Sequence, residues 1–255
     1  LEEAGRNMYN ALNPEQKAAW DKHYDPIIAR FKKDKLTGKA LAEWKYQQYM
    51  HDYMRVIHSV DRNVGRVLKY LEENGLMGNT MIVYTSDQGF YMGEHGWFDK
   101  RLMYEECLRM PFVIRYPKEI KPGTDNKDIT LNIDFAPLFL DYAGMDKPSQ
   151  MQGESFRSNL RNETPANWRQ AMYYRYWMNA DNDHNVTANY GIRTDRYKLI
   201  FYYGESLGMT GTKNESRTPE WELYDLKEDP MEMKNLYHDP SKTVSYTHLR
   251  AHETL

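Results

Sequence analysis

Large apolar residues along the first third of the chain are spaced as they are on helices. Up to Leu36 the sequence is polar, with apolar side chains on one helical face, and Asn13-Pro14 has the form of a helix start. After a break at Thr37-Gly38, apolar residues recur every three or four positions from Lys39 to Glu73. The pattern therefore predicts two helical segments that meet near residue 37.

The middle of the chain alternates between short apolar runs and a helical pattern. Met81–Thr85 and Phe112–Tyr116 are apolar and rich in β-branched residues, which is typical of strands buried on both faces. Asp134–Gly144 follows as a helix with an acidic start and a glycine stop. Strands that alternate with helices indicate an α/β fold, here part of a mostly parallel sheet flanked by helices.

The composition changes between Lys147 and Pro165, where turn-forming residues predict a link to a second unit. Beyond the link, aromatic and β-branched runs separated by turns predict a small antiparallel sheet. The expected strands are Ala171–Trp177, Ala188–Arg193, Tyr197–Tyr203 and Trp221–Leu226. A turn at Asp229-Pro230 is expected to lead into a short helix.

These patterns predict three parts of the chain. Residues 1–147 are expected to belong to the α/β domain, and residues 148–242 to the antiparallel sheet subdomain. Residues 243–255, TVSYTHLRAHETL, lack the period of the segments before them. We expect this stretch to be a non-native tail and exclude it from the reasoning about the fold.

Composition bears on partners and on compartment. Lys and Arg number 34 against 37 Asp and Glu, a formal net charge of −3, and no block of like charges predicts a nucleic-acid partner. No apolar run is long enough to span a bilayer. The single cysteine, Cys107, lies near an apolar strand and is expected to be an inert buried thiol. The first residues hold no initiator Met and no signal peptide, which does not decide the location.

Candidate chemistry lies just after the first predicted strand. Asp87 and Gln88 follow Met81–Thr85, and ligands of open α/β sheets bind at the carboxyl ends of strands. A carboxylate beside an amide oxygen suits a hard cation such as calcium. Lys100 adds a positive charge thirteen positions after Asp87, beyond a loop that contains several glycines. These residues predict an anion site with a metal and a lysine, although an ordinary polar loop could also carry the Asp-Gln pair.

The whole segment resembles a known family. SDQGFYMGEHGWFDKR, followed by MYEECLRMPFVIRYP, is similar to the metal-binding and sulfate-binding segment of type I, formylglycine-dependent sulfatases of the alkaline phosphatase superfamily. The likeness is greatest to bacterial sulfatases that act on glycans. YGIRTDRYKLI and WELYDLKEDPMEMKNLY resemble the C-terminal subdomain of the same enzymes. The resemblance runs from roughly the first helix to Pro240 and implies the C-terminal half of such an enzyme, with an alkaline phosphatase-like fold.

This resemblance implies roles for three residues. Asp87 and Gln88 match the family pair that closes a calcium (Ca²⁺) site, and Lys100 matches the lysine that contacts the sulfate group. Because calcium takes about 6–8 oxygen ligands, the others are expected in the N-terminal half of the family's catalytic domain. The family nucleophile lies in a C/S-x-P/A-x-R motif that is converted to formylglycine, and no such motif occurs in this sequence.

Three further positions are candidates for substrate binding. His95 is a candidate for a substrate contact or for a structural turn residue, and His184 precedes the strand that resembles the subdomain edge near the substrate pocket. Relatives often carry a second histidine just before that strand's Tyr-Gly, where Asn189 stands here, and this leaves the substrate type open. Arg101 could form a fork to a carboxylate or sulfate, or pair with Glu105 one helical turn further on.

The resulting hypothesis is a calcium-dependent sulfuric ester hydrolase that removes sulfate from a glycan or sugar. The chain is expected to be a fragment without its nucleophile and inactive alone. A phosphodiesterase or phosphonate monoester hydrolase of the same superfamily is one alternative, and a non-catalytic glycan-binding relative is another. The nucleophile motif of the other half would distinguish the three. The resemblance also implies a periplasmic or extracellular location.

Overall fold

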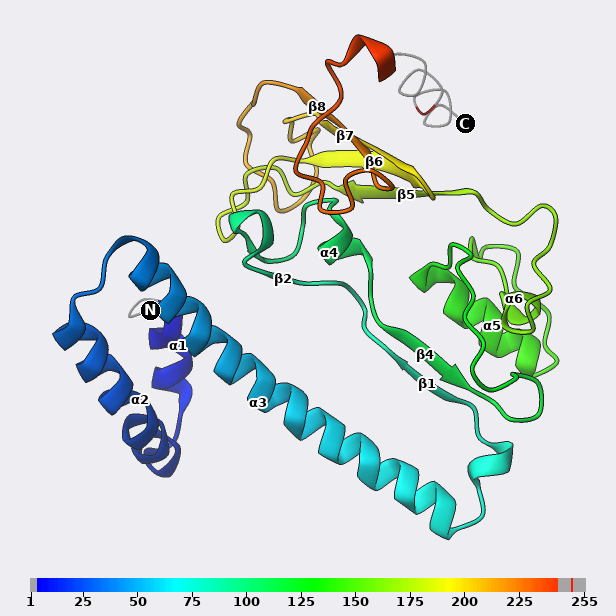
Figure 1. The fold of residues 1–255 in the computed structure, drawn as a ribbon, viewed down its shortest axis with the longest axis horizontal. Coiled ribbons are helices and arrows are strands. Elements are labelled where there is room, and N and C mark those ends of the chain that lie inside the picture. Colours follow the sequence, from blue (N-terminus) through cyan, green and yellow to red (C-terminus); the bar gives the residue numbers. More distant parts are fainter. Residues whose placement is uncertain (1–3, 243–248, 250–255) are drawn as a thin grey trace. The chain divides into compact units, whose positions relative to one another are not determined.

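The computed structural model describes residues 4–242 and residue 249, and contacts between residues divide the chain into two units. Residues 1–66 form the first unit and residues 67–255 the second. Figure 1 shows the order of the helices and strands. The division falls inside the longest helix, and each unit is described by itself.

The first unit contains α1 (Ala4–Ala11), α2 (Pro14–Asp34) and most of α3 (Gly38–Glu73). The predicted helix start at Asn13-Pro14 is confirmed. The Asn13 side chain accepts from the Gln16 amide at 2.8 Å, and the Gln16 side chain accepts from the Asn13 amide at 3.0 Å, so the two residues cap α2. Phe31 of α2 packs on Trp44 of α3, with ring centroids 4.7 Å apart. Both predicted helical segments are confirmed.

Two short strands of the second unit pair with each other. β1 (Ile82–Thr85) and β4 (Phe112–Arg115) run antiparallel. The sequence predicted strands of a parallel sheet, and for this pair the direction is wrong. The predicted burial on both faces is also wrong, since Tyr84 and Val113 are 42% and 63% exposed. The connection between the strands holds only two-residue strands and helices of three and four residues. Without a crossover helix, the chain returns in the antiparallel direction.

This connection carries most of the site candidates and contains β2 (Tyr91–Met92), η2 (Glu94–Gly96), β3 (Phe98–Asp99) and α4 (Glu105–Leu108). β2 and β3 form a small antiparallel hairpin. The carbonyl oxygens of Glu106 and Cys107 in α4 accept hydrogen bonds from the amides of Phe90 and Gly89, each at 2.8 Å. The backbone before the hairpin is therefore held by the helix that follows it.

A small core lies beside β4. The elements that follow β4 in the chain are η3 (Asn132–Asp134), α5 (Phe135–Tyr142) and α6 (Arg157–Leu160), and η1 (Met77–Asn79) precedes β1. Leu138 of α5 and Phe156 are buried here and pack with Phe112 of β4. Asp134, at the start of α5, is fully buried and forms an ion pair with Arg169. The predicted helix that begins with Asp134 is confirmed.

The C-terminal sheet contains β5 (Ala171–Tyr176), β6 (Asn189–Thr194), β7 (Tyr197–Tyr202) and β8 (Glu220–Asp225) in chain order. Every neighbouring pair is antiparallel, and β6 and β7 form the predicted hairpin. At Gly191 in β6, a Cβ would lie 2.2 Å from the Leu199 carbonyl oxygen and 2.7 Å from Met103 Sδ. The absence of a side chain thus lets Met103 approach the sheet. The predicted antiparallel sheet is confirmed.

The core between the segment around α4 and this sheet joins parts of the chain that are far apart in sequence. Its buried members are Tyr91, Leu102, Met103, Tyr104, Cys107, Val186, Ile200 and Tyr224. Burial raises the pKa of the Cys107 thiol. The predicted burial of this thiol is confirmed.

After β8 the chain turns instead of forming the predicted short helix. Glu232 has a φ of 51°, a left-handed conformation that does not continue an α-helix. The turn directs its carboxylate into the interior, where it lies 2.7 Å from Nζ of Lys198 on β7. A buried charged partner thus overrides the local helix signal.

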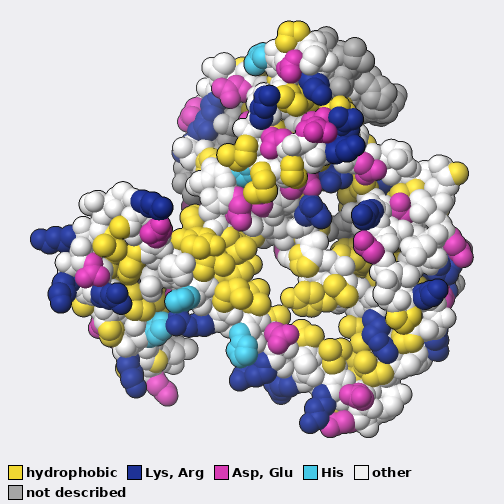
Figure 2. Space-filling model, viewed as in Figure 1, with side chains coloured by type: hydrophobic (Ala, Val, Ile, Leu, Met, Phe, Trp, Pro, Cys, Tyr) yellow, Lys and Arg dark blue, Asp and Glu magenta, His cyan; other side chains and the backbone are white. Residues whose placement is uncertain are grey.

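Charged side chains of both signs are mixed on the surfaces seen in Figure 2. Among residues 4–242, no helix is both long and apolar enough to cross a membrane. η4 (Pro240–Lys242) closes the continuous described chain, and the predicted tail lies outside it except for Leu249. The boundary near residue 147 and the exclusion of nucleic acid stay predictions.

Gly89 is a position where we expect no side chain to be tolerated. A Cβ there would lie 2.0 Å from the backbone oxygen of Glu106, which cannot rotate away. We therefore expect Gly89→Ala to lower the free energy of unfolding by about 3 kcal/mol or more, the upper end of overpacking costs. Urea denaturation measures the difference.

Gly78→Ala is the matched control, because nothing lies within 4 Å of the corresponding Cβ position. It is expected to change the free energy of unfolding by less than about 1 kcal/mol. Equal stabilities of the two alanine variants would contradict the close backbone approach at Gly89.

Candidate active site

Asp87 and Gln88 lie directly after β1, at the strand end where the sequence predicts them. The Ser86 hydroxyl donates to the Gln88 carbonyl oxygen at 2.8 Å, and the Asn132 side chain donates to the Asp87 carbonyl oxygen at 2.6 Å. These contacts hold the backbone. Asp87 itself is exposed, with Ser86 Oγ 3.4 Å from its Oδ1. The convergence of Asp87 and Gln88 on one ion stays a prediction.

The donors fit part of a metal site. A carboxylate and an amide oxygen suit a hard cation in their chemistry, but calcium takes about 6–8 oxygen ligands. Within the part of the chain that the structure describes, no group of three or more His, Cys, Asp or Glu side chains could hold a metal ion. Asp87 and Gln88 would therefore complete a site rather than form one.

The loop after Gln88 doubles back as a hairpin. Tyr91 of β2 pairs with Asp99 of β3. The turn between them contains Gly93 and Gly96, with φ values of 118° and 77°, which glycine adopts at little cost. The pairing places Asp99 and the residues that follow it alongside the segment that leaves β1.

Asp99 gathers three of the predicted site residues. Arg101 donates to Oδ2 of Asp99 at 2.6 Å, and Nζ of Lys100 lies 3.4 Å from Oδ1. His184, which is distant in sequence, places Nε2 3.6 Å from Oδ2. The sequence pointed to Lys100, Arg101 and His184 one by one, and the structure brings them together on a carboxylate that had not been proposed as a site residue.

The backbone at this cluster is strained. Asp99 has a φ of 77° and Arg101 a φ of 126°, values that cost non-glycine residues free energy and that concentrate at functional sites. The Tyr174 hydroxyl donates to the Arg101 carbonyl oxygen at 3.1 Å, and the Arg101 amide lies 3.5 Å from Cys107 Sγ. The surrounding packing thus holds an unfavourable conformation at the charged cluster.

His184 is oriented by Asp181. Oδ1 of Asp181 lies 2.8 Å from Nδ1 of His184 and accepts from the His184 amide at 3.0 Å. The Tyr176 hydroxyl donates to the other carboxylate oxygen at 2.9 Å. Burial pushes the pKa of Asp181 upward, but the hydrogen bonds from His184, Tyr176 and the backbone outweigh it and lower the pKa to about 2. An ionised Asp181 therefore directs Nε2 of the imidazole toward Asp99.

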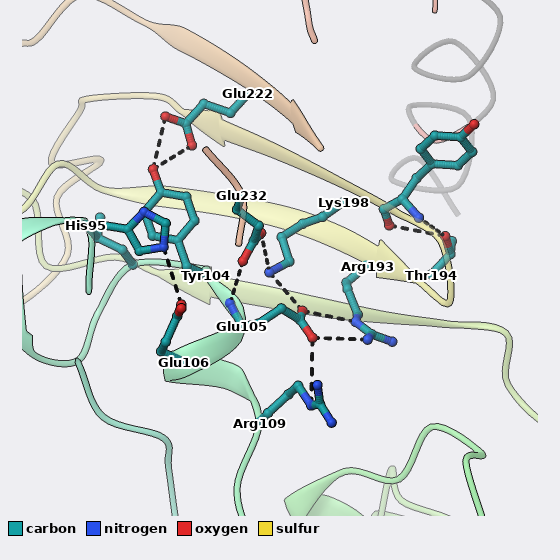
Figure 3. A network of polar contacts seen from close by, with 12 residues as sticks. His95, Tyr104, Glu105, Glu106, Arg109, Arg193, Thr194, Lys198, Glu222 and Glu232 are labelled. Carbon is teal, nitrogen blue, oxygen red and sulfur yellow. Dashed lines mark hydrogen bonds and ion pairs between the residues drawn. The ribbon is translucent and has the colours of Figure 1, made fainter. Parts of the chain in front are cut away.

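His95 is packed rather than open. Its ring stacks on Tyr104 with centroids 4.4 Å apart, and its Nε2 lies 3.4 Å from Glu106, as Figure 3 shows. The side chain is 11% exposed. These contacts match the structural alternative considered for His95, while its role toward a substrate stays a prediction.

The pairing of Arg101 with Glu105, considered as an alternative from the sequence, does not form. α4 begins at Glu105, so the two residues do not share a helix turn. Arg101 pairs with Asp99 instead, and Glu105 binds Arg193 and Lys198. Arg101 therefore belongs to the charged cluster of the hairpin.

A cleft of about 550 Å³ is lined by neighbours of the cluster residues, Trp97 and Asn185 among them. Glu220 and Glu222 add carboxylates to its wall. The Tyr104 hydroxyl donates to Glu222 at 3.0 Å, and burial raises the pKa of this carboxyl. Most of its lining side chains are polar, and Trp97, Tyr104 and Tyr202 add aromatic rings.

Two family models match this chain. One, described as sulfatase, matches residues 11–145, and the other, described as N-sulphoglucosamine sulphohydrolase, C-terminal, matches residues 93–253. Each covers more than half of the sequence. The chain belongs to the sulfatase family. Membership suggests a metal cofactor, in keeping with the oxygen donors at the end of β1.

Individual relatives refine this assignment. An N-acetylglucosamine-6-O-sulfatase of Bacteroides thetaiotaomicron is 51% identical over 233 residues, 91% of this chain and 39% of that protein. A solved structure described as a complex with its substrate D-glucosamine-2-N,6-O-disulfate is 48% identical, with a TM-score of 0.85 over 96% of this chain and 48% of that chain.

A more distant solved structure is a phosphonate monoester hydrolase from Silicibacter pomeroyi. It is 26% identical, with a TM-score of 0.64 over 76% of this chain and 38% of that chain. The chain therefore spans less than half the length of these relatives. The structural neighbours confirm the predicted alkaline phosphatase-like α/β fold class with its C-terminal antiparallel sheet.

The orientation of His184 is expected to depend on Asp181. Because the pKa of Asp181 is lowered in the fold, its ionised form stabilises the protein above the unfolded pKa near 4. That contribution is lost as the pH falls toward about 2. We expect Asp181→Asn to lower the free energy of unfolding at pH 7 by about 1–3 kcal/mol, the range for hydrogen bonds to charged groups. Urea denaturation of both proteins between pH 7 and 3 measures how this difference shrinks.

Asp183→Asn is the control, since Asp183 is exposed two residues away. It should leave the stability unchanged at every pH. A pH-independent loss in Asp181→Asn, or the same loss in both variants, would contradict the role of the ionised carboxylate.

Proposed function

We propose that this chain is the metal-completing and sulfate-contacting part of a sulfatase that acts on a glycan, with 6-O-sulfated glucosamine as the sugar. The gathering of Lys100, Arg101 and His184 around Asp99 supports this most directly. The choice of sugar is supported by the 51% identity to an N-acetylglucosamine-6-O-sulfatase and by the structure described with a disulfated glucosamine.

Lys100 would bind the sulfate group. Cleavage of a sulfate ester places negative charge on the sulfuryl oxygens and on the leaving sugar oxygen, so preorganised positive charge lowers the barrier. The Lys100 ammonium lies 3.4 Å from Asp99, longer than a normal hydrogen bond, and its side chain is 33% exposed. It is therefore free to turn toward a sulfate while Arg101 continues to neutralise Asp99.

Asp87 and Gln88 would hold calcium through their side-chain oxygens, as two of about 6–8 ligands. When bound, the ion would add positive charge at the sulfate oxygens. The sequence has no C/S-x-P/A-x-R motif, so the nucleophile would come from the part of the family's catalytic domain that this chain does not contain. The contribution of this chain is charge and orientation.

Asp99, Arg101 and His184 would orient the sugar. A sugar hydroxyl both donates and accepts, and the cluster offers a carboxylate acceptor beside a guanidinium donor. Asp181 fixes the ring of His184, so its Nε2 faces the Asp99 carboxylate. Held by these groups, the sugar would present its sulfate ester to Lys100. His95, stacked on Tyr104, would stabilise the hairpin of β2 and β3.

Phosphoester or phosphonate ester hydrolysis is the second candidate, supported by the structural likeness to a phosphonate monoester hydrolase. A non-catalytic glycan-binding role is the third. The test joins this chain to the family's nucleophile-bearing segment and offers the protein 6-O-sulfated glucosamine, phosphodiesters and phosphonate monoesters. Release of sulfate at the highest kcat/KM is the expected result. Faster release of phosphate or phosphonate, or sugar binding without turnover, would overturn the proposal.

In the joined enzyme, Lys100→Ala is expected to lower kcat about 10²–10³-fold, by analogy with deletion of one oxyanion donor. Lys100→Arg should restore only part of the rate, because a planar fork differs from a point charge in reach. Steady-state sulfate release measures both variants. Lys127→Ala, at an exposed lysine, is the control and should leave kcat unchanged. A near-normal kcat in Lys100→Ala would remove this lysine from the site.

The chain as given is expected to release no sulfate from any glycan. It lacks the nucleophile motif, and its described side chains supply too few metal ligands. Ion chromatography of sulfate after incubation with 6-O-sulfated glucosamine, with and without added calcium, tests this. Turnover above the buffer control would mean that the reaction centre lies elsewhere.

A further inference from the structure

Lys198 is a buried charge that the proposed chemistry does not use. It lies in β7 with no exposed surface, where a lysine requires charged partners. Its Nζ lies 2.9 Å from Glu105 and 2.7 Å from Glu232, as Figure 3 shows. Arg193 of β6 donates two hydrogen bonds to Glu105, at 3.1 and 3.2 Å. Two basic groups of the sheet thus face two carboxylates.

Glu105 is fixed to the sheet through both its side chain and its backbone. Its amide donates to Glu232 at 2.7 Å, while its carboxylate binds Lys198 and Arg193. Burial pushes the pKa of Glu105 upward, but these two cations outweigh it and lower the pKa. Because Glu105 is the first residue of α4, the network holds the start of this helix against the C-terminal sheet.

α4 in turn holds the segment that follows the metal-ligand pair. Its carbonyl oxygens accept from the Gly89 and Phe90 amides, immediately after Asp87 and Gln88. The Tyr91 hydroxyl donates to the Leu102 carbonyl oxygen at 3.0 Å, next to Arg101. The anchored helix therefore constrains the first end of the loop that carries the candidate site, and Tyr91 ties this end to the second.

We propose that Lys198 is a positioning residue for this site. It acts through Glu105 and α4, and it fixes the backbone on which Asp87, Gln88 and Lys100 depend. Its catalytic meaning rests on the proposed function, but the link from β7 to the Gly89 and Phe90 amides is a property of the fold. It is therefore measurable without turnover.

Amide hydrogen exchange of this chain, followed residue by residue by NMR, tests the link. We expect Lys198→Met to speed exchange of the Gly89 and Phe90 amides at least about tenfold by local opening. Amides in the ladder between β5 and β6 should change much less. Arg196→Met is the control, because Arg196 lies in the turn between β6 and β7 and forms its ion pair with Asp225 at the end of β8. It should leave Gly89 and Phe90 unchanged.

A double variant separates positioning from charge balance. Lys198→Met with Glu232→Gln removes one charge of each sign and leaves Arg193 paired with Glu105, so it should fold even where the single variant does not. We still expect faster exchange at Gly89 and Phe90. Parental exchange at both amides in the double variant would overturn the proposal, and so would equal acceleration throughout the sheet.

The two proposals fail separately. In the enzyme joined to its nucleophile segment, no sulfate release by the parent would refute the proposed function and leave the exchange result intact. Sulfate release by the parent, with unchanged Gly89 and Phe90 exchange in the Lys198 variants, would refute the positioning role and leave the function intact.

Discussion

Four charged side chains, of which Lys198 and Glu232 are buried, join the loop that carries the candidate site to the C-terminal sheet. Lys198 and Arg193 belong to the C-terminal sheet, while Glu105 begins a helix more than eighty residues earlier in the sequence. Removing one partner of such a buried network would leave an uncompensated charge, typically at a cost of about 3–5 kcal/mol. The backbone of α4 then holds Gly89 by a contact so close that no side chain fits. The position of the segment with the candidate metal ligands therefore depends on the sheet, although no residue of the sheet belongs to that segment.

Local patterns predicted the elements whose signals are local. The helix start at Asn13-Pro14, the helix that starts near Asp134, and the hairpin of β6 and β7 follow from residues that contact their own neighbours. The pairing of β1 with β4 was not predictable in this way, because strand direction depends on the intervening connection rather than on the strands themselves. The helix predicted near Glu232 does not form for a similar reason, because the Glu232 carboxylate pairs with Lys198, a residue distant in sequence.

The candidate site shows the same division. Asp87, Gln88 and Lys100 could be proposed from one contiguous motif, and their roles stay predictions. Asp99 stands within that motif, yet its importance became clear only when Arg101 and His184 met on its carboxylate. Asp181 orients His184 from three residues away, a spacing that is common in loops and carries no signal by itself. A charge cluster built from distant segments can therefore be recognised only in the folded structure, whereas the residues of a contiguous motif can be recognised in the sequence.

The most direct test of the proposed sulfate-binding site is a crystal structure of the joined enzyme with calcium and a 6-O-sulfated glucosamine bound. We expect one metal peak, confirmed by anomalous scattering, with side-chain oxygens of Asp87 and Gln88 at about 2.3–2.6 Å. We also expect Lys100 within hydrogen-bond distance of the sulfate, and a sugar hydroxyl hydrogen-bonded to Asp99 and His184. A metal bound elsewhere, or a sulfate that Lys100 does not approach, would contradict the assignment of this segment as the sulfate-binding site.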